Sequence, residues 1–359
     1  MHEITARAPA KVNLALDIVG SAAGGYHEVS TIYQAVDLED ELHFALSHSD
    51  QTSITIVSKR QSVDTSFPVD SSNIIVRAAE LFLQTLPERP RVEMKVCVEK
   101  NIPVAAGLAG GSGNAAATLL ALNYFFGLPL ARIELLVLAS KLGADVPFCL
   151  EGGTCVGRGV GDDLKQLKSI AKRSFLLVKP QELSIATSWA YNAFDEFAGP
   201  AVHPDIESAV ESLQSGNLES LSGFLGNAFE PVVFAHYPEL AVLRQKLLDL
   251  GALSCHITGK GPTLCALMPD RLTACAVGDK LTGEIDSGAR SQGVVAEEPQ
   301  SADLSSRSGI DCFVVESVPY GARLTGESRS AHQPKDLSPA VPEFCQLKGD
   351  MNADWQEKE

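Results

Sequence analysis

No stretch of the sequence is long and apolar enough to cross a membrane, since a spanning helix needs about 18 or more consecutive apolar residues. The opening residues, Met1-His2-Glu3-Ile4-Thr5, have neither an apolar signal-peptide core nor the Arg- and Ser-rich character of a transit peptide. We therefore predict that membranes are not a partner. We also predict a cytoplasmic protein, or one of the plastid stroma if the source is an alga or a plant.

Positive charge is scarce. The chain has 29 Lys and Arg residues against 45 Asp and Glu residues, which gives a formal net charge of −16. A surface this acidic repels the phosphate backbone of nucleic acids, so nucleic acid is excluded as a partner. Any phosphate that the protein binds has to be neutralised locally, by backbone N–H groups, by a few well-placed cations or by Mg²⁺.

Several familiar motifs are also absent. The eight cysteines include no Cys-x-x-Cys pair, and the Cys and His residues lack the clustered spacing of a zinc site. No Gly-Lys-Ser/Thr completes a P-loop, and the glycines do not fit the Gly-x-Gly-x-x-Gly pattern of dinucleotide-binding proteins. The sequence therefore predicts neither a structural zinc protein, nor a P-loop enzyme, nor a dinucleotide-binding fold.

What remains is the composition of a globular protein. The 359 residues are 45% hydrophobic and 21% charged, which predicts a sizeable core and about two domains. Helical and strand patterns are mixed without strict β-α-β alternation, which favours an α+β fold. Strands are predicted at 4–20, 29–38, 41–46, 54–57, 92–98, 175–179, 254–258, 264–267 and 311–318, and helices at 73–86, 114–126, 133–142, 204–215, 217–227, 237–250 and 271–281.

The domain boundaries follow from this pattern. We predict an N-terminal domain at residues 1–172 and a C-terminal domain at 173–323. Residues 283–308 are rich in Ser, Gly, Glu and Asp, which predicts a flexible insertion in the second domain. Residues 324–359 are polar and interrupted by prolines, which predicts a disordered tail.

A glycine-rich segment stands out in the middle of the first domain. It reads Pro103-Val104-Ala105-Ala106-Gly107-Leu108-Ala109-Gly110-Gly111-Ser112-Gly113, and a helix is predicted to follow from about Asn114. Small residues let backbone approach a phosphate, and a helix N-terminus presents free N–H groups and positive charge to it. The segment predicts a phosphate site, in which the Ser112 hydroxyl could bind phosphate or Mg²⁺. The alternative is a tight strand–helix connection with close packing.

Two isolated charges could supply the chemistry of phosphoryl transfer. Lys11 lies in an apolar strand pattern, and Asp145 lies among Gly, Ala, Val, Pro and Phe. As a pair, the lysine would hold the carboxylate ionised and aligned to accept a proton from a hydroxyl group. The alternatives are an outward-facing lysine on a strand and an aspartate that caps a helix or forms a turn.

Three motifs, in this order, resemble those of the GHMP kinases. They are Ala8 to Leu14 with Gly25-Tyr26-His27-Glu28 after it, Pro103 to Ala117, and Thr258 to Thr263. Residues 143–148 and 185–191 are also similar, and the resemblance covers residues 4–323. It implies a two-domain fold, with a ribosomal-protein-like N-terminal α/β domain and a ferredoxin-like C-terminal domain.

The Gly-Tyr-His sequence resembles one branch of that family. The resemblance implies ATP- and Mg²⁺-dependent phosphorylation of the 2-hydroxyl of 4-diphosphocytidyl-2-C-methyl-D-erythritol, an isoprenoid precursor of the non-mevalonate pathway. It implies that Asp145 is the base, Lys11 its partner, and residues 103–113 the ATP loop. The implied substrate contacts are Asn13 near the reaction centre, Tyr26 and Tyr191 stacked on cytosine, His27 hydrogen-bonded to its edge, and Thr187.

Some points stay open at this stage. Asn73 is placed either near the adenine pocket or at a helix N-cap. Two residues depart from the family pattern: Lys260 replaces a small hydroxyl residue, and Gly113 replaces one of two adjacent hydroxyl residues. Other expectations are a kinase of another small alcohol, or a non-catalytic nucleotide-binding relative. A monomer or weak homodimer is expected.

Overall fold

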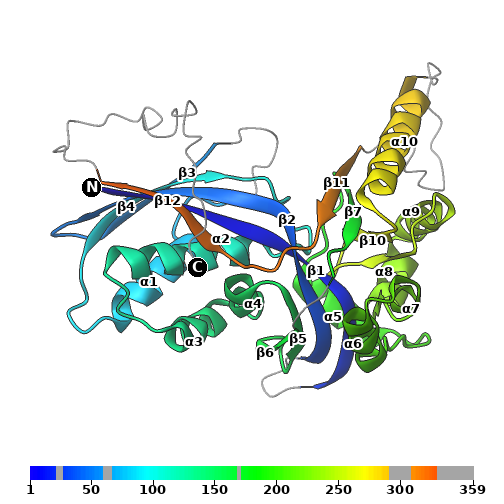
Figure 1. Ribbon diagram of the computed structural model, residues 1–359, viewed down its shortest axis with the longest axis horizontal. Helices are drawn as coiled ribbons and strands as arrows, with labels where there is room; N and C mark the ends of the chain where they lie inside the picture. The colour runs from blue at the N-terminus through cyan, green and yellow to red at the C-terminus, as the bar shows by residue number, and fades with distance from the viewer. Residues whose placement is uncertain (22–26, 60–66, 168–170, 291–308, 330–359) are drawn as a thin grey trace.

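The computed structural model describes residues 1–21, 27–59, 67–167, 171–290 and 309–329. The chain forms two sheets that lie side by side in Figure 1, each with its own helices. The α+β prediction is confirmed. Among the described residues, none of the helices combines the length and the apolar character that crossing a bilayer requires.

Two very long strands dominate the first sheet. β1 (His2–Ser21) and β2 (His27–His48) pair antiparallel along their whole length. The sequence predicted two separate strands where β2 is continuous. The pairing register shifts at three places, one of them between Pro9 and Ala10, so the ribbon bends instead of breaking. Next to it lie β3 (Ser53–Ser58), β4 (Val92–Glu99), β5 (Thr154–Arg158), β6 (Asp163–Leu167), β8 (Gly226–Asn227) and β12 (Arg323–Arg329).

Helices cover one face of this sheet, as Figure 1 shows. They are α1 (Ile74–Thr85), α2 (Gly110–Phe125), α3 (Arg132–Leu142) and α4 (Asp145–Glu151). The helix α2 is the central one and is buried along most of its length, because its small residues let it pack closely against β1 and α1. The short helix α4 was not predicted from the sequence.

The second sheet has the antiparallel order β11-β7-β10-β9. Its strands are β7 (Ser174–Pro180), β9 (Ser254–Ile257), β10 (Leu264–Met268) and β11 (Ile310–Glu316). Its helices are α5 (Thr187–Glu196), α6 (Ile206–Ser215), α7 (Leu218–Ser222), α8 (Glu230–His236), α9 (Pro238–Asp249) and α10 (Arg271–Arg290). A second core lies between this sheet and the helices α5, α8, α9 and α10. The helices α6 and α7 pack into another core, which contains residues of both sheets. The helices α5 and α8 were not predicted.

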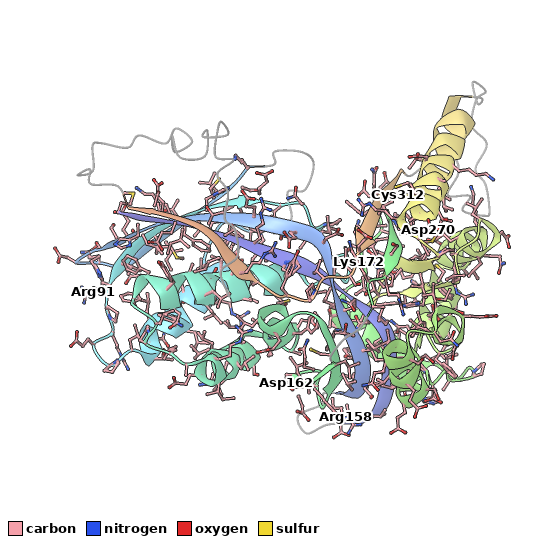
Figure 2. The ribbon with its side chains drawn as sticks, viewed as in Figure 1. Arg91, Arg158, Asp162, Lys172, Asp270 and Cys312 are labelled. Carbon is pink, nitrogen blue, oxygen red and sulfur yellow. The ribbon has the colours of Figure 1, made fainter. Side chains whose placement is uncertain are left out.

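Polar contacts join the two halves where the chain passes from one sheet to the other. Lys172, labelled in Figure 2, precedes β7, and its Nζ lies 2.7 Å from Glu316 of β11. The backbone N–H of Glu316 donates to Asp37 of β2 at 2.7 Å, and the N–H of Val318 donates to the carbonyl of Ala35 at 2.9 Å. These contacts fix the end of β11 to the first sheet.

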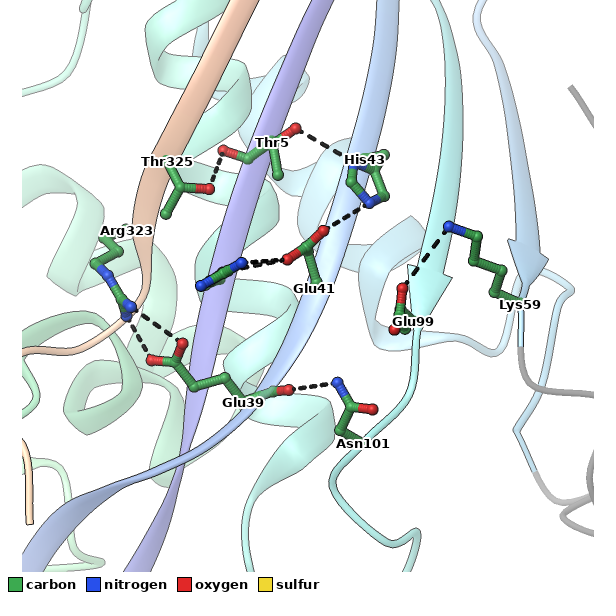
Figure 3. A network of polar contacts seen from close by, with 10 residues as sticks. Thr5, Glu39, Glu41, His43, Lys59, Glu99, Asn101, Arg323 and Thr325 are labelled. Atoms are coloured by element: carbon green, nitrogen blue, oxygen red, sulfur yellow. Dashed lines mark hydrogen bonds and ion pairs between the residues drawn. The ribbon is translucent and has the colours of Figure 1, made fainter. Parts of the chain in front are cut away.

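Two predictions about the C-terminal third are wrong. The predicted tail at 324–359 begins too early, because residues 323–329 form β12, paired antiparallel with β1. Arg323 of β12 makes a bidentate pair with Glu39 of β2, at 2.6 and 3.0 Å (Figure 3). The predicted insertion also begins too early, because α10 continues to Arg290. Residues 291–308 and 330–359 lie outside the described residues.

Backbone pairing explains why polarity was a poor guide to β12. An edge strand obtains its hydrogen bonds from the neighbouring backbone, so its exposed side chains can be polar. Only Leu324 of the strand packs against the core of the first sheet. The domain boundary predicted at 323 therefore lies between β11, a strand of the second sheet, and β12, a strand of the first sheet.

Removing β12 is expected to destabilise the first sheet. A chain that ends at Ala322 should unfold at least about 2 kcal/mol more easily than one that ends at Arg329, because it loses several ladder hydrogen bonds of ~0.5–1.5 kcal/mol each and the packing of Leu324. Urea unfolding of the two truncated chains measures the difference. Equal midpoints and slopes would show that β12 contributes nothing.

Candidate active site

The glycine-rich segment forms a loop with three left-handed residues at alternate positions. Ala105, Gly107 and Ala109 have φ values of 54°, 75° and 57°. Such turns direct successive N–H groups towards one concavity. The helix α2 begins at Gly110, four residues before the predicted start. The prediction was wrong because glycine is a poor helix former, whereas here close packing against β1 outweighs that cost.

The loop encloses a cavity of about 340 Å³. The cavity is lined by residues 103–112 and by Asn114, and its opposite wall consists of Phe67, Pro68, Asn73, Ile74 and Lys100. Asn73 also caps α1, because its Oδ1 accepts a hydrogen bond from the Ile75 N–H at 2.9 Å. Asn73 is therefore the N-cap of α1 and also lines the cavity, and a position next to adenine stays a prediction.

Gly113 faces the sheet. A Cβ atom built on it would lie 3.1 Å from the Cβ of Ala8 and 3.6 Å from the carbonyl oxygen of Pro9. Gly113 does not line the cavity, whereas Ser112 does. The absence of a hydroxyl at position 113 therefore removes no ligand from the cavity, and it allows α2 to approach β1 closely.

A buried polar cluster lies beneath the first turn of α2. Lys100 pairs with Asp40, which also accepts hydrogen bonds of 2.9 Å from the N–H groups of Asn101 and Ile102. With its amide oriented to satisfy its surroundings, Asn114 donates to Asp40 at 3.0 Å. Burial raises the pKa of Asp40, and the charge of Lys100 opposes this shift.

Lys100 brings positive charge to the cavity wall. Its Nζ lies 3.0 Å from the position that a Cβ of Gly110 would take, so it is directly beside the positive end of α2. Sequence reasoning missed Lys100. The signal was present, because a single lysine precedes the loop in Glu99-Lys100-Asn101-Ile102-Pro103.

Lys11 and Asp145 do come together. Lys11 Nζ lies 4.0 Å from Asp145 Oδ2, and the exposed fractions of the two side chains are 4% and 36%. Lys11 therefore points inward, so the alternative of an outward-facing lysine is excluded. Asp145 begins α4, where the N-terminal end of the helix favours its negative charge. The arrangement puts a partly exposed carboxylate next to a buried cation.

Tyr33 is a neighbour of this pair that the sequence did not single out. Burial, followed by the charge of Asp145, raises the pKa of Tyr33 well above its ordinary value. Its ring lies 5.6 Å from Lys11 Nζ and stacks on Phe148 at 4.9 Å. Tyr33 thus remains neutral at physiological pH and forms one wall of the site. Nothing in the alternation of β2 distinguishes it from a core tyrosine.

Asn13 connects Lys11 to a second glycine turn, formed by residues 258–261. Its Oδ1 accepts hydrogen bonds from Lys11 Nζ at 2.7 Å and from the Gly259 N–H at 3.0 Å. Its Nδ2 donates to Thr31 at 2.8 Å, and its backbone N–H donates to the Thr258 hydroxyl at 2.9 Å. These contacts position Lys11. A direct contact of Asn13 with a substrate stays a prediction.

The two glycine turns, far apart in the sequence, lie backbone to backbone. A Cβ on Gly107 would lie 2.5 Å from the carbonyl oxygen of Thr258, and one on Gly259 would lie 3.2 Å from the carbonyl oxygen of Gly107. Gly107, Gly259 and Gly261 all have left-handed φ values of 75°, 59° and 81°. Side chains at Gly107 and Gly259 would push the turns apart, and the left-handed backbone of Gly261 is unfavourable for other residues.

Aromatic side chains gather on the far side of the second turn. His27 stacks on Tyr191 at 4.5 Å with an interplanar angle of 14°, and its Nε2 lies 2.7 Å from Asp195. Burial, followed by the charge of Asp145, raises the pKa of Tyr191 to about 12.

Thr187 begins α5 and is exposed. Tyr26 lies outside the described residues. Asp195 was missed, because only the folded α5 brings it to His27.

One further cluster could be considered for a metal. The ligand atoms of Glu41, His43 and Glu99 lie within 4.8 Å of one another, in the network of Figure 3. Arg7 pairs with Glu41 at 2.9 Å, and Lys59 pairs with Glu99 at 3.7 Å. Because each carboxylate already has a cation beside it, this cluster is better explained as ion pairing.

Comparison with known proteins connects this geometry to a family. The model of the GHMP kinases N terminal domain matches residues 73–153, and the model of the GHMP kinases C terminal domain matches residues 206–285. The chain is 37% identical over 284 residues to the 4-diphosphocytidyl-2-C-methyl-D-erythritol kinase of Enterococcus faecalis, covering 78% of this chain and 95% of that protein. It is 35% identical over 331 residues to the enzyme of the same name from Thermosynechococcus vestitus, covering 88% and 97%.

Comparison with solved structures finds kinases of the same fold. A crystal structure of 4-(cytidine 5′-diphospho)-2C-methyl-D-erythritol kinase superposes with a TM-score of 0.63 at 27% identity, covering 88% of this chain and 99% of that chain. Homoserine kinase from Cytophaga hutchinsonii superposes with a TM-score of 0.67 at 21% identity, covering 90% and 97%, which is a likeness of fold.

Proposed function

Because this chain belongs to the GHMP kinase family, and within it to the 4-diphosphocytidyl-2-C-methyl-D-erythritol kinases, we propose that it transfers the γ-phosphoryl group of ATP to the 2-hydroxyl of 4-diphosphocytidyl-2-C-methyl-D-erythritol. The observation that carries the proposal is the position of the Lys11–Asp145 pair, next to the turn that packs on the glycine-rich loop. Each part of the reaction has residues suited to it.

The loop of residues 103–113 would hold the ATP phosphates. Its left-handed turns, the N-terminus of α2 and Lys100 together supply N–H groups and positive charge around the cavity. Asn73 and the apolar residues of the opposite wall would contact the nucleoside. The Ser112 hydroxyl is the group suited to Mg²⁺, which would neutralise phosphate charge when bound.

Asp145 would act as the general base. As the 2-hydroxyl oxygen forms its bond to the γ-phosphorus, its proton passes to the Asp145 carboxylate, and the bond from phosphorus to the leaving oxygen of ADP breaks. The buried Lys11 ammonium would keep the carboxylate aligned, while Asn13 fixes Lys11 from the other side. Positioning, together with electrostatic stabilisation of the transferred group, accounts for most of the catalysis in phosphoryl transfer.

His27 and Tyr191 would recognise cytosine, with Tyr26 as a third group. Tyr191 offers a flat face for stacking, and the His27 imidazole offers a hydrogen bond to the polar edge of the base. The two rings already stack on each other, so cytosine has to displace His27 from that face before it can stack on Tyr191. The acceptor chain would then extend towards Asp145.

A comparison of ADP release rates with three different acceptors tests the proposal. ADP release should be fast with the cytidyl-methylerythritol compound and at least ~100-fold slower with homoserine or mevalonate, because a buried polar site rejects substrates that leave its groups unpaired. Similar rates with all three would favour a kinase of another small alcohol. No ADP release with any of them, despite ATP binding, would favour a non-catalytic relative.

A further inference from the structure

The second glycine turn carries a lysine with no role in the reaction as described. Lys260 lies at its tip, between Gly259 and Gly261, which both have left-handed backbone angles. The turn is fixed in place, because Gly259 packs on Gly107 and its N–H donates to Asn13. The Lys260 side chain therefore starts from a rigid point close to the reaction centre.

From this point the Lys260 side chain extends to the stacked rings of His27 and Tyr191. Lys260 Nζ lies 5.0 Å from the centroid of the Tyr191 ring, which also stacks on His27. The charge of Asp145 acts on both Lys260 and Tyr191. The preceding residue, Gly259, lies beside Lys11, because a Cβ atom built on it would lie 3.5 Å from Lys11 Nζ. Lys260 is thus close both to the ring proposed to stack on cytosine and to the Lys11–Asp145 pair.

The Lys260 ammonium is half-buried and, in the described parts of the chain, forms no ion pair within 4.0 Å with a carboxylate. Burial, partly offset by Asp145, lowers its pKa. A cation withdrawn from water without a counter-ion costs free energy unless an anion reaches it. The arrangement is therefore suited to an anionic ligand.

The proposed acceptor substrate contains such an anion, its diphosphate, between the cytosine base and the reacting hydroxyl. A cytidine diphosphate ester of a sugar alcohol has the base at one end, the reacting hydroxyl at the other and two phosphates between them. Lys260 does not line the cavity of the glycine-rich loop, whereas Lys100 does. Its position is therefore better suited to the acceptor than to ATP.

We propose that Lys260 binds the diphosphate bridge of the acceptor substrate and so selects acceptors that carry a nucleoside diphosphate. The inference rests on the proposed function and adds to it a specificity-determining residue that this chain has in place of the small hydroxyl residue of similar kinases. It also implies that the Lys260 ammonium moves away from the Tyr191 ring when the acceptor binds.

Binding of cytidine and of cytidine 5′-diphosphate, measured by calorimetry, tests the proposal without turnover. Wild-type protein should bind the diphosphate more tightly than the nucleoside. Lys260→Met should weaken diphosphate binding by about 10- to 100-fold, the range of a charge-assisted hydrogen bond, and change cytidine binding by less than about 2-fold. Lys260→Arg should restore most of the difference, and Lys280→Met, which removes an exposed charge on α10, should change neither.

Each other outcome has a distinct meaning. Unchanged diphosphate affinity in Lys260→Met overturns the inference and leaves the proposed function intact. A loss of affinity for a non-hydrolysable ATP analogue, with cytidine diphosphate unaffected, assigns Lys260 to ATP and also overturns it. Equal affinity of wild-type protein for cytidine and cytidine 5′-diphosphate also overturns the inference. If wild-type protein binds neither and phosphorylates no cytidyl acceptor, the proposed function itself fails.

Discussion

Asp145→Asn is expected to lower kcat by ~10²–10⁴, the range for a positioned general base, while ATP binding stays near wild type. The amide has the same shape as the carboxylate, so α4 and its neighbours should remain in place. It cannot accept the hydroxyl proton, and it gives Lys11 no counter-charge. Steady-state kinetics and ATP titration of the variant measure the two effects separately.

A matched variant separates the base from a general effect of charge. Asp163→Asn removes a carboxylate from the exposed strand β6 and should leave kcat within about 2-fold of wild type. Turnover of Asp145→Asn close to wild type would show that another group accepts the proton. An equal loss in both variants would show that net charge, and not the base, is responsible.

Gly107→Ala has the second-largest expected effect. The new Cβ would lie 2.5 Å from the carbonyl oxygen of Thr258, at a residue whose φ of 75° is unfavourable for alanine. We expect a loss of ~2–4 kcal/mol in the free energy of unfolding, from backbone strain and overpacking. ATP affinity should fall at least ~10-fold, because the two glycine turns have to separate. Denaturant unfolding and ATP titration provide the measurements.

Ala109→Gly is the matched control, with the opposite expected sign. Ala109 already has a left-handed φ of 57°, so glycine relieves strain there and should cause no loss of stability or a small gain. If Gly107→Ala were tolerated as well as Ala109→Gly, the close approach of the two turns would not matter for the site.

The residues that sequence reasoning found have a common feature. Lys11 and Asp145 are single charges among apolar residues, and the small residues of the loop form one continuous run. Such local contrasts predict function because a charge in an apolar segment needs a reason to be there. The family motifs then supplied the substrate, which the physical pattern alone does not specify.

The residues that it missed depend on tertiary contacts. Lys100 directly precedes the loop in the sequence, but only the fold shows its contact with Asp40. Asp195 comes next to His27 only because α5 brings it there. Tyr33 stacks on Phe148, which lies far along the chain. β12 was missed for a related reason, since its pairing energy comes from the backbone of β1 and leaves no apolar pattern.

The most direct test of the central claim is the identity of the product. Wild-type protein with ATP, Mg²⁺ and 4-diphosphocytidyl-2-C-methyl-D-erythritol should give one new phosphomonoester, and phosphorus and carbon NMR should locate it on the oxygen of carbon 2. That result would mean that the hydroxyl next to Asp145 and Lys11 is the one activated. A phosphate on another hydroxyl, or ADP formed without a phosphorylated acceptor, would contradict the account.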